Sequence, residues 1–333
     1  MAIDFQILGQ PGRDNALLVR IDSGQSISRL LFDCGEGCLS DLKNSEVGSI
    51  DHVLFSHFHM DHISGFDSFF RCNYNRDTKP NTIWGPPGTS DLMHCRFRGF
   101  LWNLHHDQNA AWHAVDVMPD RTETKRFELS EAFAVCHAHG EQAHSGTLID
   151  TEEYSVEALH LDHKTASLAY VVREKPRSNV DSEKLVELGL NPGAWLKQLK
   201  SADSIDVIVE IDGQSFEVAE LRKQLLIETE GSSIAYLTDF KLDAATRPRL
   251  LTLLAECDTV ICEAQYRSAD LELAIRNYHM TTQQVAELAR DANIGQLILF
   301  HLSDRYTPAE WLEMLAEAKA IFPRTSFAGH WSM

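Results

Sequence analysis

The sequence S-H-F-H-M-D-H at residues 56–62 places four metal-ligand side chains within six positions, directly after a short apolar segment typical of a β-strand. In extended chain, residues two apart point the same way, so His57 and His59 can share one ion. Asp61 and His62 follow where a helix is expected to begin, and they can bind a second ion. Neutral imidazole and carboxylate are ligands of zinc and similar divalent metals. The stretch therefore predicts a metal site rather than a histidine-rich surface loop.

Around this stretch, short β segments come first and an alternation of strands and helices follows. Strands are expected at Ile3–Leu8, Ala16–Ile21, Arg29–Phe32, Val53–Ser56, Phe133–His137, Tyr154–Leu159, Ser167–Arg173, Ile234–Leu237, Thr259–Cys262 and Gln296–Phe300. Helices are expected at Ala244–Ala255, Thr282–Ala292 and Ala309–Ile321. Thr281 with Gln284, and Thr307 with Glu310, fit capping boxes at two of the helix starts. This order predicts an α/β fold with sheets at the centre and helices outside.

Composition narrows the class of protein. No run of 18 apolar residues exists, so no membrane-spanning helix is expected. The balance of 30 Lys and Arg against 49 Asp and Glu, a net charge of −19, argues against a surface that attracts nucleic acid or anionic membrane everywhere. The seven cysteines include no C-x-x-C pair and no secretory signal is recognisable, so we expect reduced thiols and a cytoplasmic location.

Further segments carry a family resemblance. They are F-D-C-G-E-G at 32–37, G-P-P-G-T at 85–89, H-M-T-T at 279–282 and L-I-L-F-H-L-S-D-R-Y at 297–306. Together with residues 56–62, they resemble the metallo-β-lactamase superfamily, whose signature is H-x-H-x-D-H, and most closely its ribonuclease Z branch. The resemblance implies an αββα sandwich of two mixed β-sheets with helices outside. It also implies a single domain over residues 1–333, in which the irregular, charged stretch near 176–233 is an insertion.

The resemblance also implies the remaining metal ligands. It makes His163 the third histidine, with His160 as its nearest rival and His137, His139 and His144 also available in the sequence. The ligand set that it implies is His57, His59, His163 and Asp239 for one metal and Asp61, His62, Asp239 and His301 for the other. Two divalent ions about 3.5–4 Å apart can hold a hydroxide between them and stabilise an in-line phosphoryl displacement. We expect zinc, with manganese or iron as alternatives.

Proton transfer and substrate binding are assigned by the same resemblance. Asp61 is a catalytic as well as a ligand residue, and Glu263 with His279 forms a relay that protonates the leaving oxygen. Each of the last two could instead be an ordinary residue at the end of a strand or helix. Ser303, Arg305 and Tyr306 follow the last ligand, and we expect them either to contact substrate phosphate or to pack in the loop. Asp33, before the glycine-rich turn, is expected to support the metal histidines.

Two departures from the family pattern concern the substrate. The family's basic Pro-x-Lys-x-Arg-Asn loop should lie near the start, but residues 9–15 are short and contain no lysine. Its basic, glycine- and proline-rich arm should lie between the third histidine and the bridging aspartate, but residues 201–206 and 210–212 are acidic. Two divalent ions would bring the net charge of −19 only to about −15.

The sequence therefore predicts a dinuclear metal phosphodiesterase that resembles ribonuclease Z, nominally an endonuclease that removes the 3′ trailer of pre-tRNA. Because the arm and the basic loop are not recognisable, the alternative is a hydrolase of a small phosphodiester such as a cyclic nucleotide or a phospholipid head group. Lactone or ester hydrolysis is a third hypothesis. A non-catalytic binding protein is a fourth, and the complete set of ligands argues against it. The resemblance also implies a homodimer, and the lack of a long apolar run predicts no membrane partner.

Overall fold

The computed structural model describes residues 3–24, 26–105, 107–200 and 207–331, so the acidic stretch 201–206 lies outside the described residues. The chain divides into two compact units. The first, here called the body, comprises Met1–Arg173 and Ser232–Met333. The second, here called the inserted unit, is Glu174–Gly231. Among the described residues, no helix has the length and apolar character needed to cross a bilayer.

One sheet of the body has eight strands in sequence order. They are β1 (Asp4–Gly9), β2 (Asn15–Asp22), β3 (Ile27–Phe32), β4 (His52–Leu54), β5 (Asn81–Gly85), β6 (Ala111–Val117), β7 (Arg121–Glu128) and β8 (His137–Ala143). Strands β3 to β6 pair in parallel, and the strands on either side pair antiparallel. The carboxyl ends of β3, β4 and β5 therefore meet at one edge of the sheet.

The second sheet of the body has seven strands, in the order β19-β18-β17-β16-β11-β10-β9. Their bounds are β9 (Thr147–Asp150), β10 (Tyr154–Asp162), β11 (Ala166–Glu174), β16 (Ser233–Leu237), β17 (Thr259–Glu263), β18 (Gln296–Phe300) and β19 (Thr325–Ser326). Strands β16 to β19 are parallel, and β11 pairs antiparallel with β16. Both sheets are thus mixed, as predicted.

Alternate residues of β3 show why the two sheets pack face to face. Leu30 and Phe32 point into the core between the sheets, where the Phe32 ring lies 5.4 Å from that of Tyr170 and 5.7 Å from that of Tyr236. Leu31, between them, points to the opposite face and joins a second core with Phe66. A strand covered on both faces is continuously apolar, and residues 30–32, L-L-F, have this character.

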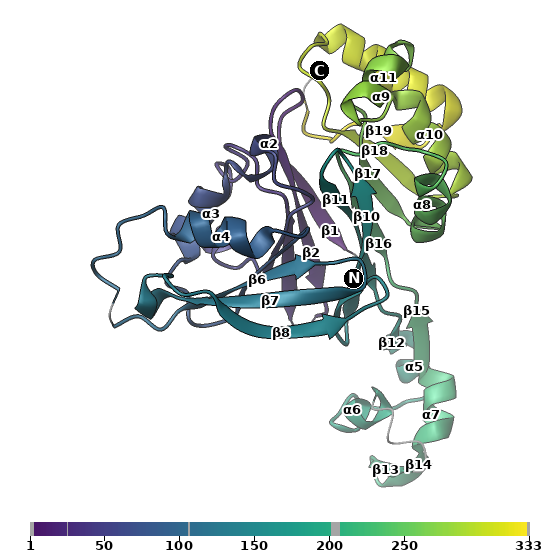
Figure 1. Cartoon of the computed structure of the whole chain (residues 1–333). Coiled ribbons are helices and arrows are strands. Elements are labelled where there is room, and N and C mark those ends of the chain that lie inside the picture. Colours follow the sequence, from purple (N-terminus) through teal and green to yellow (C-terminus); the bar gives the residue numbers. More distant parts are fainter. Residues whose placement is uncertain (1–2, 25, 106, 201–206, 332–333) are drawn as a thin grey trace. The chain divides into compact units, whose positions relative to one another are not determined.

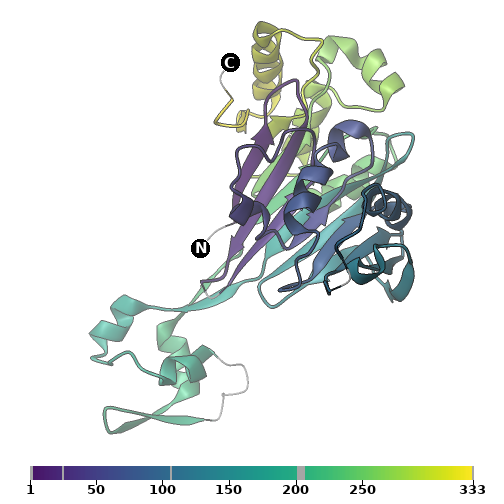
Figure 2. The ribbon, with the colours of Figure 1, turned by 90° about the vertical axis from the view of Figure 1, so that its left-hand side faces the viewer.

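Helices cover the outer face of each sheet (Figures 1 and 2). On the first sheet lie α1 (Asn44–Val47), α2 (Met60–Ile63), α3 (Phe66–Asn73) and α4 (Thr89–Phe97). On the second lie α8 (Thr246–Leu254), α9 (Leu271–Asn277), α10 (Thr282–Asp291) and α11 (Pro308–Ile321). Both predicted capping boxes form, at the starts of α10 and α11. The arrangement confirms the αββα sandwich.

One strand prediction was wrong. Residues Phe133–His137 do not form a strand, because β8 begins only at His137. A 3₁₀ helix, η1 (Leu129–Glu131), comes first, and Ala132 and Phe133 then adopt the left-handed backbone conformation with φ of 54° and 56°. Phe133 is buried because its ring packs against Phe97, so its apolar character reflects the core rather than strand periodicity.

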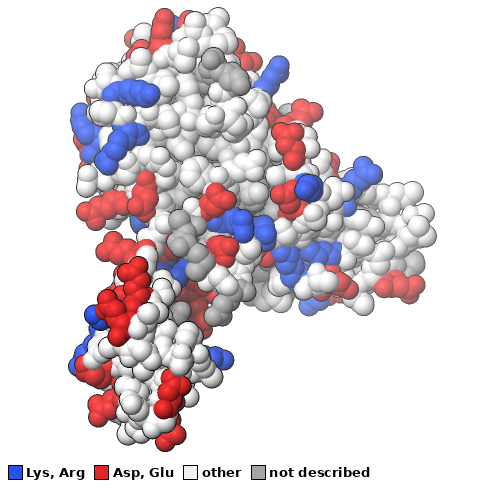
Figure 3. Space-filling view, turned by 180° about the vertical axis from the view of Figure 1, so that it is seen from behind, with Lys and Arg blue, Asp and Glu red and all other residues white. Residues whose placement is uncertain are grey.

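The inserted unit has a small core of its own, built around Leu185, Trp195 and Leu221. Its elements are β12 (Arg177–Val180), α5 (Ser182–Glu187), α6 (Trp195–Lys200), β13 (Ile208–Ile211), β14 (Gln214–Glu217), α7 (Val218–Leu225) and β15 (Leu226–Thr229). Between residues 174 and 231 the sequence has twelve Asp and Glu against seven Lys and Arg. Figure 3 shows acidic side chains over the visible face of this unit, which is the opposite of a basic arm.

Candidate metal centre

The seven predicted ligands lie in loops or in a short helix after the carboxyl ends of strands, on the same edge of the sandwich. They follow β4 (His57 and His59), β10 (His163), β16 (Asp239) and β18 (His301), while Asp61 and His62 lie in α2. Asp239 and His301 have positive φ angles of 45° and 49°. Such angles are uncommon for residues with side chains and persist where the surroundings impose them, often at functional sites.

The first group of ligand atoms comes from His57, His59, His163 and Asp239, and all of them lie within 4.8 Å of one another. Oδ2 of Asp239 is 3.6 Å from Nε2 of His57 and 3.6 Å from Nε2 of His163. The His57 and His59 rings are 4.6 Å apart, as expected for alternate residues of an extended segment.

The second group consists of Asp61, His62, Asp239 and His301, again within 4.8 Å. The same Oδ2 of Asp239 is 3.3 Å from Nε2 of His62, so this carboxylate lies between the two groups. Nε2 of His301 is 3.2 Å from Oδ2 of Asp61. In the part of the chain that the structure describes, none of the alternatives His137, His139, His144 and His160 joins a group of three or more ligand-type residues.

The hydrogen bonds of the histidines suit them to hold cations. Nδ1 of His57 lies 3.1 Å from the Ser56 hydroxyl, and Nδ1 of His163 lies 2.7 Å from the Tyr278 carbonyl oxygen. With the Nδ1 proton used in this way, each Nε2 lone pair faces the cluster. Among the described residues, the buried Nε2 atoms of His57 and His62 have no hydrogen-bond partner. Buried polar atoms are rarely left unpaired, so these two fit a metal that accepts their lone pairs.

A buried hydrogen-bond network around Asp33 supports the centre. Oδ2 of Asp33 lies 2.8 Å from Nδ1 of His62 and accepts hydrogen bonds from the hydroxyls of Ser56 at 2.7 Å and Tyr236 at 2.8 Å. The Ser56 amide donates to the other oxygen. The expected support by Asp33 thus has a geometric basis. The sequence reasoning missed Ser56, Tyr236 and Tyr278, although Ser56 stands next to the motif.

The charges of the cluster are strongly coupled. Burial alone would raise the pKa of Asp239, but the neighbouring imidazoles, first His301 and then His62, hold it well below its ordinary value. Burial, followed by the neighbouring His62, lowers the pKa of His57 to about 2. His57 is therefore neutral near pH 7, which is the state in which imidazole binds a metal.

Glu263 and His279 form a hydrogen-bonded pair near Oδ1, the other carboxylate oxygen of Asp239. Nδ1 of His279 is 3.0 Å from Oε2 of Glu263 and 3.9 Å from Oδ1 of Asp239. Glu263 is fully buried at the end of β17, and its other oxygen accepts the Phe240 amide hydrogen. Burial lowers the pKa of His279, but the Glu263 carboxylate outweighs it and raises that pKa to about 9. The pair therefore carries a proton at neutral pH.

The three residues expected near the substrate are placed differently from one another. Arg305 is exposed, and its guanidinium carbon lies 5.6 Å from the centre of the Tyr266 ring. Ser303 accepts the Arg305 amide hydrogen at 3.4 Å. Tyr306 is buried and donates its hydroxyl to Asp270 at 2.6 Å, so its side chain is occupied within the protein.

Two family models and a known protein match this chain. The family model described as anti-Pycsar protein Apyc1 matches residues 13–175, and the beta-lactamase superfamily domain matches residues 197–302. The ribonuclease Z of Deinococcus radiodurans is 48% identical over 325 residues, which cover 98% of this chain and 97% of that protein.

Two solved structures share the fold. The metallo-β-lactamase fold protein YhfI from Bacillus subtilis superposes with a TM-score of 0.58 at 15% identity, over 98% of this chain and 96% of that one. The short form of human tRNase Z superposes with a TM-score of 0.51 at 18% identity, over 92% and 94% of the two chains.

Proposed function

Because the chain belongs to the ribonuclease Z family of the metallo-β-lactamase superfamily, we propose that it is a metal-dependent phosphodiesterase that removes the 3′ trailer of pre-tRNA. The observation that carries this proposal is the pair of ligand groups that share Asp239, together with the full-length relative. The products are a tRNA with a 3′-hydroxyl and a trailer with a 5′-phosphate.

The ligand roles follow the two groups. His57, His59 and His163 would hold one divalent ion, His62, Asp61 and His301 would hold the other, and the Asp239 carboxylate would be available to both. The chemistry that such ions would supply is a lower pKa for bound water and stabilisation of the charge on the phosphoryl oxygens. Five histidines with two carboxylates form a ligand set typical of zinc, so zinc is the proposed metal.

The residues of the chain itself supply proton transfer and orientation. The Asp61 carboxylate is 42% exposed, so it can reach an attacking water molecule and take its proton. His279, charged through Glu263, gives a proton to the leaving 3′ oxygen. Ser303 and Arg305 contact phosphate, while the hydrogen bond from Tyr306 to Asp270 suits that tyrosine to hold their loop in place. The site of action that we propose is the cytoplasm.

A two-substrate assay tests this function. The protein, loaded with zinc or manganese, is incubated with bis-p-nitrophenyl phosphate and, separately, with a pre-tRNA that carries a 3′ trailer. We expect cleavage of both, with the trailer removed at a single site, and loss of both activities in Asp239→Ala. Cleavage of the small diester alone would replace the proposal with a small-phosphodiester hydrolase. Cleavage of neither substrate by protein with two bound ions would point to esters or lactones.

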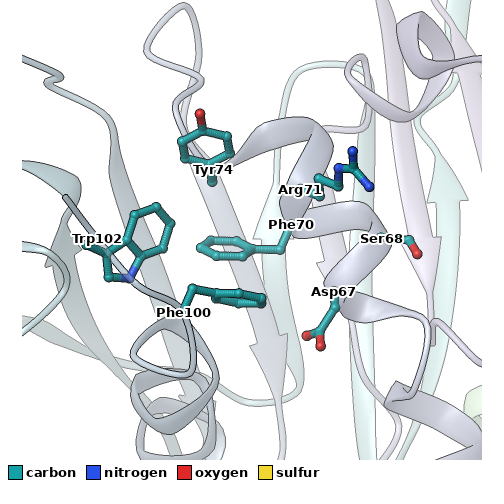
Figure 4. A pocket seen from close by; sticks show the side chains of 7 residues that line it. All are labelled: Asp67, Ser68, Phe70, Arg71, Tyr74, Phe100 and Trp102. Carbon is teal, nitrogen blue, oxygen red and sulfur yellow. The ribbon is translucent and has the colours of Figure 1, made fainter. Parts of the chain in front are cut away.

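We also propose that two copies associate through an apolar patch on the first sheet's side of the body. Phe70, Tyr74, Phe100 and Trp102 surround a cavity of about 430 Å³ between α3 and the loop that follows α4 (Figure 4). On the same loop, Leu101 and Leu104 are 87% and 84% exposed. Apolar side chains gathered in this way mark an interaction site, and a second copy offers the same surface in return.

Light scattering coupled to size-exclusion chromatography tests the dimer. The wild type should elute as a dimer, and Leu101→Lys/Leu104→Lys as a monomer, because two buried charges outweigh the apolar area of the interface. Leu312→Lys, on α11, alters a leucine that is 49% exposed elsewhere and should leave the dimer intact. A wild type that is monomeric at micromolar concentration would overturn the proposal.

A further inference from the structure

Two lysines share one tyrosine ring at the rim of the metal centre. The ammonium nitrogens of Lys164 and Lys241 each lie 5.2 Å from the centre of the Tyr278 ring. The two like charges are therefore at most about 10 Å apart, and the electron-rich ring attracts both. Neither lysine belongs to a motif that the sequence reveals. Lys164 directly follows His163, and Lys241 follows Asp239 by two positions.

Neither lysine forms an ion pair with a carboxylate among the described residues. In the described ranges, neither ammonium has a carboxylate within 4.0 Å, although Asp and Glu outnumber Lys and Arg in the chain by 49 to 30. The nearby carboxylates of Asp162 and Asp243 accept backbone amide hydrogens instead, from Lys164 at 2.9 Å and from Thr246 at 2.8 Å. The Asp243 carboxylate interacts with Lys241 only at longer range, so both ammonium groups are left without a direct ion pair and can contact a further anion.

Backbone contacts hold the lysines and the ring beside the metal ligand His163. The Tyr278 carbonyl oxygen lies 2.7 Å from Nδ1 of His163. The amide of Lys241 donates to the Asp162 carbonyl oxygen at 2.9 Å, which joins the loop after β16 to the end of β10. Lys164 and Tyr278 have left-handed backbones, with φ of 59° and 61°. Such conformations indicate that the surroundings fix the backbone of both residues, which sets where their side chains begin.

We propose that Lys164 and Lys241, oriented by Tyr278, bind backbone phosphates of the RNA next to the scissile bond. This inference rests on the proposed function and deepens it. The family's basic loop and basic arm are not recognisable in this acidic protein. The positive charge that holds the polyanion would instead come from these two lysines at the metal centre. Lysine suits the task because its ammonium is a point charge that tolerates variation in phosphate geometry.

The test measures binding and cleavage separately on the same fluorescent pre-tRNA. Fluorescence anisotropy gives Kd at a series of salt concentrations, without divalent metal, and a cleavage assay on metal-loaded protein gives kcat and KM. Each phosphate contact on a single strand contributes about 0.7 to the slope of log Kd against log salt, so Lys164→Gln/Lys241→Gln should lower the slope by about 1.4. KM should rise at least about 10-fold, with a smaller change in kcat. Lys164→Arg/Lys241→Arg should restore most of the affinity.

The controls separate a specific site from general charge. Lys43→Gln/Lys319→Gln removes two exposed lysines elsewhere on the body and should leave the slope unchanged. Tyr278→Leu keeps the backbone carbonyl that His163 contacts, and should weaken binding without loss of metal. An unchanged slope in the Lys164/Lys241 variant, an equal drop in the control variant, or no pre-tRNA binding by the wild type would each overturn the inference. Binding by the wild type without trailer cleavage would instead overturn the proposed function alone.

Discussion

Asp239→Ala should reduce the bound metal from two ions per chain to fewer than one, and phosphodiester cleavage should fall by at least about 10³-fold. Asp239 is the only residue shared by both ligand groups among the described residues, and one of its oxygens lies within 3.6 Å of three imidazole Nε2 atoms. Its removal would take away the anion that we propose to lie between two cations, and would leave like charges facing one another. Loss of any single histidine should affect mainly one ion.

Metal content by inductively coupled plasma spectrometry and the thermal midpoint with and without added zinc measure the effect. A ligand that binds only the folded state raises the midpoint, so the rise seen in the wild type should disappear in the variant. Asp304→Ala is the matched control, since Asp304 is an exposed carboxylate three residues after His301. Two ions bound to Asp239→Ala would contradict the bridging role.

The candidate ligands at residues 57–62 could be predicted from the sequence because the local backbone conformation sets their positions. His57 and His59 alternate in extended chain, and α2 begins at Met60, so four ligands are positioned within six residues. The third histidine could not be chosen by spacing. His160 lies within β10, whereas His163 lies in the turn between β10 and β11, and it is this turn that reaches the cluster.

Contacts between distant segments set the limit of the sequence reasoning. Asp33 and Tyr236 are separated by 203 residues, and His163 and Tyr278 by 115. The sequence around each of these residues contains no pattern that predicts its distant partner. Strand β7 was missed for a different reason. Its sequence, R-T-E-T-K-R-F-E, contains one large apolar residue, so no alternation of apolar and polar side chains reveals the strand.

His279→Gln should lower kcat for pre-tRNA by about 10²–10⁴-fold while both metal ions remain bound. The leaving group in pre-tRNA is a ribose 3′ oxygen, a strong base that needs a proton as it departs. Nδ1 of His279 is bonded to the buried Glu263, so its Nε2 is the remaining donor. p-Nitrophenolate is a weak base and leaves without help. Cleavage of bis-p-nitrophenyl phosphate should therefore fall far less.

The dependence on the leaving group distinguishes proton donation from a structural role, which would impair both substrates alike. The pH profile gives a second test, because Glu263 raises the pKa of His279 and so keeps the proton bound to higher pH. In Glu263→Gln the alkaline fall of kcat for pre-tRNA should begin at lower pH than in the wild type. His137→Gln is the matched control, since His137 pairs with Glu131 at 2.6 Å outside both ligand groups. Equal losses on the two substrates in His279→Gln would show that the histidine positions Asp239 rather than protonating the leaving oxygen.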